Sequence, residues 1–279
     1  MLKVLKSGFF TSIQDAGRFG YRDKGVPVSG VMDSWTVSKL NMLLENKHDA
    51  AVLEITMTGP TLLFEEQTHI AIGGAEMSAT LNNKPMRNNR IYRIAAGDIV
   101  SFGRLLKGLR SYLAIKGGFL SKSVLGSRSM YFPITSKNHL PDRAEVHYEQ
   151  ESTFEPKISE YQADDLLDET VLEVHQGPEY HILADKQLEN LFFRDFTVAK
   201  ENNRMAYQLK ETIGGHDTTM LTSATLSGSV QLTPEGKLII LMKDGQTTGG
   251  YPRVLQLSDH AISLLAQKKF GDSISFKLS

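Results

Sequence analysis

The stretch 238–252 joins an apolar run to a loop of chemically versatile side chains. The run 238–242 has the length and composition of a buried strand. The loop that follows supplies a carboxylate, an amide, two hydroxyls, a glycine pair and a phenol: Asp244, Gln246, Thr247, Thr248, Gly249, Gly250 and Tyr251. A short loop placed by a rigid strand is a common way to present a binding site. The other interpretation is a surface hairpin with a solvated tip.

A second stretch, residues 11–33, has the same character. It carries Gln14, Asp15, Arg18 and Ser29 among closely spaced glycines. Glycine tolerates backbone angles closed to other residues and lets a ligand approach the main chain. Two loops with the same residue types suggest a site shared between two halves of the chain.

Asp15, Asp244 and Tyr251 are the candidate catalytic groups. A carboxylate acts as a general base when desolvation or a neighbour raises its pKa toward neutrality. The phenol of Tyr251 can donate a hydrogen bond to an oxyanion. Structural interpretations stay open, because an Asp before Gly often closes a turn, as Asp244 could, and Tyr251 could simply begin a strand.

Several arginines stand beside glycine or in polar clusters and are candidate anion clamps. A planar guanidinium binds a carboxylate or phosphate with two parallel hydrogen bonds. The run Gly126-Ser127-Arg128-Ser129 is the most suggestive, because backbone N–H groups and hydroxyls can join the guanidinium. Surface or interface ion pairs are the alternative. The five arginines are Arg18, Arg104, Arg110, Arg128 and Arg204.

Composition and missing motifs exclude several classes of function. The net charge of −1 over 279 residues argues against a general nucleic-acid binder. The absence of cysteine excludes disulfides, thiolate nucleophiles and Cys-ligated metals, and the eight scattered histidines form no metal motif. No phosphate-binding glycine loop occurs. No long apolar run or secretion signal is visible, so we expect a cytoplasmic protein that does not bind membranes.

Strand patterns dominate the chain and predict a mainly β protein. Short apolar or alternating runs lie between glycine-rich turns at 52–56, 61–64, 69–73, 91–94, 111–115, 171–175, 238–242, 253–257 and 274–278. One clear helix is expected, over 33–44, with Asp33 as its N-cap. Shorter helical segments are candidates near 180–192 and 258–267.

The sequence also divides into two similar halves. Gly97-Asp98 precedes a short run that ends in Ser-Phe, and Gly271-Asp272 precedes another. This internal echo predicts a duplicated β-barrel module. We place the first lobe at 1–150 and the second at 171–279, with an acidic linker at 151–170 between them.

The two loops carry a resemblance to a known family. Residues 14–33 resemble the opening of the allophanate hydrolase subunit 2 family, also described as biotin-dependent carboxyltransferase-like, which includes the C subunit of bacterial 5-oxoprolinase. The stretch 244–252 matches the most specific motif of that family. Further matches run in order through Glu54, Gly59-Pro60, Gly73-Gly74, Gly97-Asp98, Gly108-x-Arg110-x-Tyr112, Gly117-Gly118, Gly126-Ser127-Arg128-Ser129, Gly177-Pro178 and Arg204-Met205.

The resemblance implies two cyclophilin-like β-barrel lobes and a partner, a B subunit that is similar to allophanate hydrolase subunit 1. In the three-subunit 5-oxoprolinase, the A, B and C subunits open the lactam of 5-oxoproline to L-glutamate with ATP. Because this chain has no nucleotide loop, we assign ATP to another subunit. Lys243 lacks the flanking residues of a biotinylated lysine, so no biotin is expected on this chain.

Within this hypothesis, Arg18 or Arg128 holds a carboxylate or phosphate, and Gln14 and Gln246 position the amide substrate. Ser29, Thr247, Thr248, Gly249 and Gly250 complete the predicted substrate-binding set. Two other hypotheses stay open. The chain could be a regulator that binds and counteracts a kinase-inhibitory B subunit, or a biotin-dependent carboxyltransferase lobe acting on urea or a related amide.

The chain departs from the family pattern at two places. Members usually continue after the Gly-Ser-Arg-Ser motif with a glycine-rich stretch, whereas residues 130–150 contain no glycine. The motif at Arg204 is normally followed by Gly and later Arg, but Ala206 and Gln208 stand there. These changes bear on the preference for substrate or partner.

Overall fold

The computed structural model describes residues 1–162 and 165–279. They form two compact units. The first unit contains residues 1–18 and 29–167, and the second contains 19–28 and 168–279. Residues 19–28, which the sequence analysis places in the first lobe, therefore belong with the second unit, and residues 151–167 of the proposed linker belong with the first. Asp164, one of the acidic residues of that linker, lies outside the described residues.

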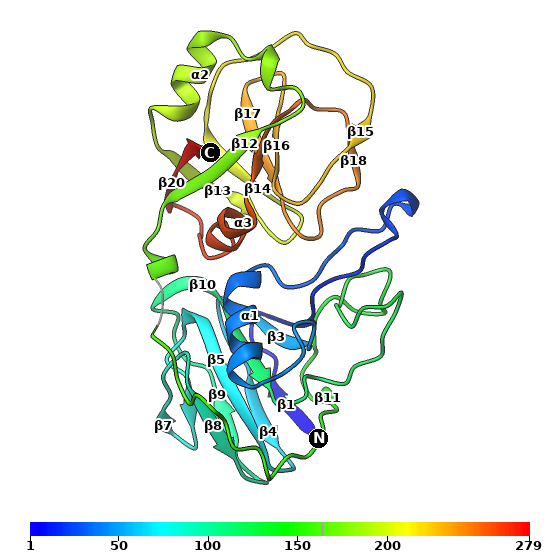
Figure 1. The fold of residues 1–279 in the computed structure, drawn as a ribbon, viewed down its shortest axis with the longest axis vertical. Helices are drawn as coiled ribbons and strands as arrows, with labels where there is room; N and C mark the ends of the chain where they lie inside the picture. The colour runs from blue at the N-terminus through cyan, green and yellow to red at the C-terminus, as the bar shows by residue number, and fades with distance from the viewer. Residues whose placement is uncertain (163–164) are drawn as a thin grey trace. The chain divides into compact units, whose positions relative to one another are not determined.

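The first unit is built from two β-sheets (Figure 1). One has the strand order β11 (Glu145–Val146), β1 (Leu2–Lys6), β4 (Thr61–Phe64), β9 (Ile99–Ser101), β6 (Thr80–Leu81) and β7 (Lys84–Pro85). The other has the order β2 (Phe10–Gln14), β3 (Val52–Thr56), β10 (Lys107–Ile115), β5 (Thr68–Glu76) and β8 (Ile91–Ile94).

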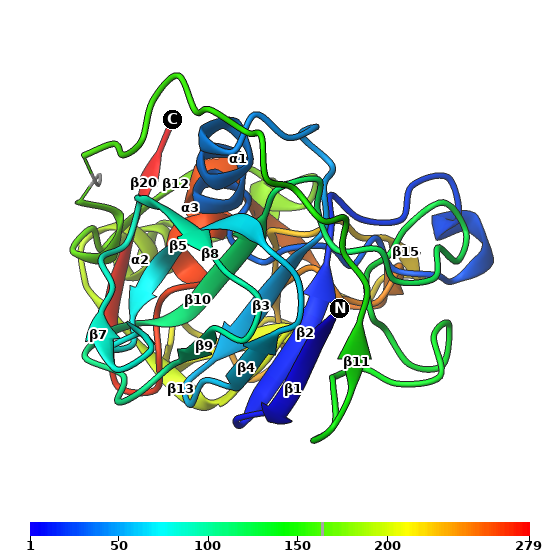
Figure 2. The ribbon, with the colours of Figure 1, turned by 90° about the horizontal axis from the view of Figure 1, so that it is seen from below.

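Both faces of the five-stranded sheet are buried, and period-2 alternation assigns each residue to a face. Leu53 and Ile55 of β3 enter the core shared with the six-stranded sheet. Val52 faces the other way and packs with the helix α1 (Ser34–Leu43), which lies against β5 and β10 (Figure 2). Glu54 shares this helix-side face, so the strand carries one carboxylate into an apolar layer.

The helix α1 begins and ends as its sequence dictates. Asp33 is the N-cap, and its carboxylate accepts hydrogen bonds from the Thr36 amide at 2.9 Å and the Thr36 hydroxyl at 2.7 Å. At the other end, the Lys116 ammonium donates to the carbonyls of Leu44 and Glu45 at 2.9 and 3.3 Å. A cation at the C-terminus satisfies carbonyls that the helix leaves without partners. The predicted helix over 33–44 is confirmed.

The second unit contains the closed barrel that the strand spacing predicts. Its strand order is β12 (Val171–Gln176), β19 (Arg253–Leu257), β16 (Ser229–Leu232), β17 (Lys237–Leu241), β14 (Ala206–Thr212), β13 (Phe196–Asn202) and β20 (Ser273–Leu278). A two-stranded ribbon accompanies it, made of β15 (Ser223–Ala224) and β18 (Thr248–Gly249).

Short helices complete the second unit. The helix α2 (Asp185–Phe192) packs against β20, and α3 (Asp259–Leu265) packs against β12 and β19. Single 3₁₀ turns are η1 (Arg22–Lys24) and η3 (Tyr180–Ile182), and in the first unit η2 (Asp165–Leu167). The candidate helical segments near 180–192 and 258–267 are thus present. The mainly β class is confirmed, although the first unit consists of two sheets around one core and the second of a closed barrel.

The internal echo is a real repeat of turn geometry. Gly97 and Gly271 have φ angles of 90° and 91°. Asp98 then accepts a hydrogen bond from the amide three residues earlier at 2.7 Å, and Asp272 does the same at 2.9 Å. Each turn leads directly into a strand, β9 or β20, with apolar side chains buried in the core of its unit.

The segment that follows the first unit's last strand is held against that unit. Phe154 meets the His69 ring edge-on at 5.3 Å between centroids, and the Lys116 ammonium lies 4.1 Å from the Phe154 centroid. Burial and the nearby Arg93 cation lower the pKa of His69. The amide of Tyr161 donates to the Asn89 carbonyl at 3.0 Å. Residues 151–162 therefore form part of the first unit.

Gly177 provides a test of close packing in the second unit. A Cβ at this position would lie 2.1 Å from the Arg253 carbonyl oxygen, which belongs to a barrel strand. We expect Gly177→Ala to lower the free energy of unfolding by about 2 kcal/mol or more, measured by urea denaturation. The matched control is Gly250→Ala, because a Cβ there meets nothing within 4 Å. Equal stability of the two variants would contradict the packing argument.

Candidate functional site

The Asp15 carboxylate is the centre of one polar cluster in the first unit. Its Oδ1 accepts hydrogen bonds from the Gly17 amide at 2.9 Å, the Ser127 hydroxyl at 2.7 Å and the Ser129 hydroxyl at 2.6 Å. Its Oδ2 accepts from the Arg128 amide at 2.5 Å. Asp15 is 8% exposed. We call Asp15, Ser127, Arg128 and Ser129 the Asp15 cluster. It joins the two predicted first-lobe motifs, residues 14–18 and 126–129.

The two arginines of these motifs bind backbone carbonyls of the same loop. Arg18 is fully buried and donates to the carbonyls of Val124 at 3.2 Å and Ser129 at 2.7 Å. The half-buried Arg128 guanidinium donates to the Ser121 carbonyl. In this structure both guanidinium groups fix the loop 121–129, so the geometry gives them a structural task beside the predicted anion binding.

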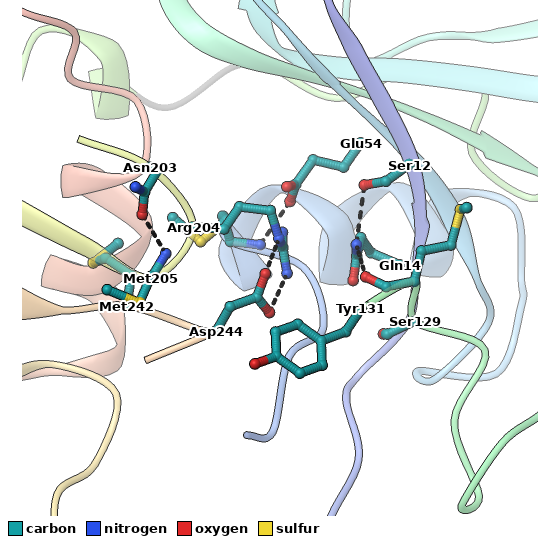
Figure 3. Close-up of polar contacts among 12 residues, drawn as sticks. Ser12, Gln14, Glu54, Ser129, Tyr131, Asn203, Arg204, Met205, Met242 and Asp244 are labelled. Carbon is teal, nitrogen blue, oxygen red and sulfur yellow. Dashed lines mark hydrogen bonds and ion pairs between the residues drawn. The ribbon is translucent and has the colours of Figure 1, made fainter. Parts of the chain in front are cut away.

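Gln14 and Ser29 are also buried. Gln14 donates from its amide nitrogen to the Ser12 hydroxyl at 3.0 Å and the Met130 carbonyl at 3.2 Å (Figure 3). Ser29 is 1% exposed and has a φ of 57°, a left-handed conformation that is rare for serine. Its hydroxyl has no hydrogen-bond partner among residues 1–162 and 165–279. Strained backbone together with an unsatisfied hydroxyl is typical of positions kept for function.

A second polar cluster lies on the helix-side face of the five-stranded sheet. Glu54 is fully buried, and its Oε2 accepts hydrogen bonds from the Met32 amide at 2.7 Å and the Tyr112 hydroxyl at 3.0 Å. The Arg110 Nε lies 3.9 Å from Glu54 Oε1. The Tyr112 hydroxyl in turn accepts from the Asp33 amide at 2.9 Å. Burial and the charge of Glu54 raise the pKa of Tyr112 well above its usual value.

Sequence reasoning named Arg110 as a candidate anion clamp and Glu54 and Tyr112 as family matches, but it did not join the three residues into one site. A signal was present, because Glu54 is the one charged residue in the strand run 52–56. The register pairs Tyr112 with Glu54 across β10 and β3. This cluster fixes Met32 and Asp33, and so the end of the predicted loop 11–33.

The second unit contains the predicted loop 244–251. Asp244 forms a two-pronged ion pair with Arg204, with Nε–Oδ2 at 2.8 Å and Nη2–Oδ1 at 3.2 Å (Figure 3). Both side chains are nearly buried, at 9% exposure for Arg204 and 12% for Asp244. The backbone reinforces the pair, because the Asp244 amide donates to the Arg204 carbonyl at 2.8 Å. Two motifs forty residues apart thus meet in one contact.

Thr225, which sequence reasoning missed, organises the rest of this loop. Its hydroxyl donates to the Gln246 carbonyl at 2.5 Å and its amide to the Thr247 carbonyl at 3.0 Å. The Arg22 guanidinium donates to the Thr225 carbonyl, and burial lowers the pKa of Arg22. No sequence pattern marks Thr225, because its role depends on the pairing of β15 with β18.

The glycines of the loop differ in their surroundings. A Cβ on Gly249 would lie 2.5 Å from the side-chain nitrogen (Nε2) of Gln231 and 2.9 Å from the side-chain nitrogen of Gln246. Gly250 is exposed, with open space around it. Gln246 and Thr248 are exposed, Thr247 is half-buried, and Tyr251 is 42% exposed. The loop therefore presents an amide, hydroxyls and a phenol on a rigid base.

A second ion pair, also missed from sequence, holds the strand after this loop. Arg253 binds Glu179 through two hydrogen bonds of 2.9 and 2.7 Å. The hydrogen bond with Arg253 lowers the pKa of Glu179. Arg253 also donates to the Ala224 carbonyl, next to Thr225.

Among the residues that the structure describes, no group of three or more His, Asp or Glu side chains is placed to hold a metal ion. In the same residues, no helix has the length and apolar character needed to cross a membrane.

Replacing Asp15 by Asn tests whether this carboxylate supports the fold of the loop. The amide nitrogen of Asn cannot accept a hydrogen bond, so buried donors of the cluster lose their partner. We expect a loss of about 2–3 kcal/mol in the free energy of unfolding. Asp142→Asn is the control, since exposed Asp142 also accepts from a backbone amide, at 2.7 Å, and its loss should stay below about 1 kcal/mol. Unchanged stability in Asp15→Asn would refute the structural role.

The Arg204–Asp244 pair is suited to a double-mutant cycle. Arg204→Met or Asp244→Ala alone leaves one nearly buried charge without its partner, which costs about 3–5 kcal/mol. The double variant should lose less than the sum, with a coupling of about 1–3 kcal/mol. The exposed pair Lys186–Glu189 is the control, with an expected coupling of about 0.5 kcal/mol. Strict additivity at Arg204 and Asp244 in urea unfolding would show that the ion pair contributes nothing.

Comparisons with known proteins show which family this chain belongs to. The family model "Carboxyltransferase domain, subdomain A and B" matches residues 24–278. The chain is 32% identical to the C subunit of 5-oxoprolinase from Escherichia coli, over 99% of this chain and 90% of that protein. It is 30% identical to the C subunit of 5-oxoprolinase from Haemophilus influenzae, over 99% and 91%.

A solved structure shows the same fold. The crystal structure of Kluyveromyces lactis urea carboxylase matches 99% of this chain and 27% of that chain, with a TM-score of 0.87 and 28% identity. The chain therefore belongs to the family of carboxyltransferase domains with subdomains A and B.

Proposed function

We propose that this chain is the C subunit of an ATP-dependent 5-oxoprolinase and works with the A and B subunits in the cytoplasm to hydrolyse 5-oxoproline to L-glutamate. One observation carries the proposal. The chain is 32% identical to the C subunit of 5-oxoprolinase from Escherichia coli and spans 90% of that protein, whereas it spans 27% of the urea carboxylase chain.

The chemistry of the reaction divides the work between subunits. A lactam carbonyl is a poor electrophile, and phosphorylation of its oxygen by ATP makes it reactive. We assign ATP binding to another subunit, because this sequence has no phosphate-binding loop. This chain then binds the substrate, orients its amide and stabilises charge on the carbonyl oxygen.

From the contacts in each unit we infer different tasks for the predicted residues. Asp15 is enclosed by four hydrogen-bond donors, so its role is to position the loop 126–129. In the second unit, Asp244 and Arg204 hold the loop 244–251. Its exposed members Gln246, Thr248, Gly250 and Tyr251 are the groups of that loop that we expect to touch a ligand.

The similarity to urea carboxylase supports a second candidate, a carboxyltransferase lobe that acts on urea or a related amide. That reaction needs carboxybiotin from a partner, whereas lactam hydrolysis does not. Avidin, which sequesters biotin, separates the two candidates.

The test is reconstitution. We expect ATP-dependent release of glutamate from 5-oxoproline by this chain together with the A and B subunits, loss of activity when any one is omitted, and no effect of avidin. A fully assembled complex without activity would refute the proposal, and avidin-sensitive turnover of urea would favour the carboxyltransferase.

Within the active complex, Tyr251→Phe tests the exposed phenol. Loss of one hydrogen-bond donor to a developing oxyanion should lower kcat by about tenfold to a hundredfold, with no loss of stability. Tyr180→Phe, in the same unit, is the matched control and should retain full activity. Full activity of Tyr251→Phe would exclude the phenol from the chemistry.

A further inference from the structure

Residues 151–162, which we call the strap, run over the surface of the first unit. The strap contains no helix or strand, apart from an isolated bridge between Glu160 and Arg90. Most of its residues are exposed, but Phe154 and Tyr161 are half-buried and pack against the apolar cluster that α1 shares with the five-stranded sheet. These two rings are the apolar anchors of the strap.

The ion pairs of the strap add little to the hold of these rings. The Lys157 ammonium lies 3.5 Å from the Glu45 carboxylate, and the Arg90 guanidinium lies 3.7 Å from the Glu160 carboxylate. Both pairs are at the surface, where water and salt screen the charges and an ion pair contributes little to stability. Apart from a few backbone hydrogen bonds, the packing of the two rings is what attaches the strap.

The first anchor packs against a buried histidine. His69 is 6% exposed, and its ring meets the Phe154 ring edge-on at 5.3 Å between centroids. The Nδ1 atom of His69 is buried and has no hydrogen-bond partner in the part of the chain that the structure describes. A neutral imidazole has one N–H donor, whereas an imidazolium has two and carries a charge. Because a buried charge without a partner costs much free energy, this position favours the neutral ring.

The charged groups around His69 also oppose its protonation. Arg93 of β8 is paired with His69 across the sheet, and the Lys116 amide, just after β10, donates to the His69 carbonyl at 2.8 Å. Glu151, on the strap, acts in the opposite direction. Burial has the largest effect, and together with the two cations it lowers the pKa of His69.

We propose that His69 and Phe154 form a pH-sensitive clasp, which holds the strap on the first unit while the imidazole is neutral and releases it when the imidazole is protonated. Protonation adds a positive charge close to Arg93 and Lys116 and leaves a buried N–H without an acceptor. Opening of the strap exposes the ring to water, which hydrates the charge and supplies the acceptor. The clasp thus makes the attachment of the strap depend on acidity, and it goes beyond the proposed function.

The direction of the pH effect follows from the lowered pKa. In the open strap, an exposed His69 titrates near the ordinary value of 6.5, and in the closed strap it titrates lower. As the pH falls below about 6.5, the open state binds more protons than the closed state, so closure is weakened. The clasp is therefore at full strength above this pH. At pH 5.5, about one unit lower, the opening equilibrium should rise by up to about tenfold.

Amide hydrogen exchange of the whole chain, followed by NMR from pH 7.5 to 4.5 and expressed as protection factors, tests the clasp. The reporters are three amides that donate between the strap and the rest of the first unit: Glu151 to Gln67, Tyr161 to Asn89 and Ile91 to Ser159. We expect their protection to fall by about tenfold between pH 7.5 and 5.5. At every pH it should stay below that of amides in the central strand β10, because the strap opens without unfolding of the sheet.

Three variants identify the group that titrates. His69→Phe keeps a ring against Phe154 but cannot be protonated, so the fall in protection should shrink to less than about twofold. Arg93→Gln keeps the imidazole and removes one cation, so the loss of protection should level off at a higher pH. The matched control is His139→Phe, because His139 also contacts a phenylalanine ring, Phe10 at 5.4 Å, but is exposed. This control should keep the whole effect.

Either of two results would overturn the clasp. An equal fall in protection in the wild-type chain and in His69→Phe would show that another group carries the pH dependence. Equal protection of the strap amides and the β10 amides would show that the strap leaves the first unit only when that unit unfolds. If His69→Phe does not fold, an unchanged levelling-off pH in Arg93→Gln contradicts the proposal instead. No step of the test uses enzyme activity, so this inference and the proposed function succeed or fail separately.

Discussion

The hydrogen bonds accepted by the buried Asp15 carboxylate hold together the two candidate loops of the first unit, residues 14–18 and 126–129. It accepts hydrogen bonds from residues 112 to 114 positions further along the chain, where the loop 121–129 has no regular secondary structure of its own apart from an isolated bridge. Without a helix or strand, backbone N–H groups and hydroxyls need another acceptor. One carboxylate supplies it, and Arg18 satisfies carbonyls of the same loop.

In the second unit, different contacts fix the candidate loop. Its loop 244–251 is fixed by an ion pair at one end, Arg204–Asp244, and by Thr225 in the middle. Two further arginines, Arg22 and Arg253, donate to carbonyls of residues 224–225. In both units, charged side chains form hydrogen bonds with backbone groups. In the second unit, smaller polar side chains of the loop 244–251 stay exposed. A rigid base with exposed hydroxyls and amides is what orientation of a small ligand requires.

The sequence was informative where local physics decides the structure. The strand runs, the N-cap at Asp33 and the repeated Gly-Asp turns follow from periodicity, capping and left-handed glycine. The polar loops were found because glycine and polar residues cluster in them. The partners of Asp15 were not predictable, since a carboxylate before a glycine turn looks the same whether it meets solvent, substrate or a distant loop. Thr225 carries no local pattern at all, because its role comes from strand pairing.

The membership of residues 19–28 in the second unit has a consequence for the synthesis of this protein. The chain leaves the first unit after Arg18, returns to it at Ser29 and leaves it again after Leu167. Arg22 binds the carbonyl of a residue 203 positions later. As the ribosome makes the protein, all residues of the first unit are synthesised before residues 168–279. Until then, residues 19–28 have no barrel strands of the second unit to pack against. A gene fragment that encodes residues 168–279 alone would therefore lack ten residues of the second unit, because those residues are encoded inside the first.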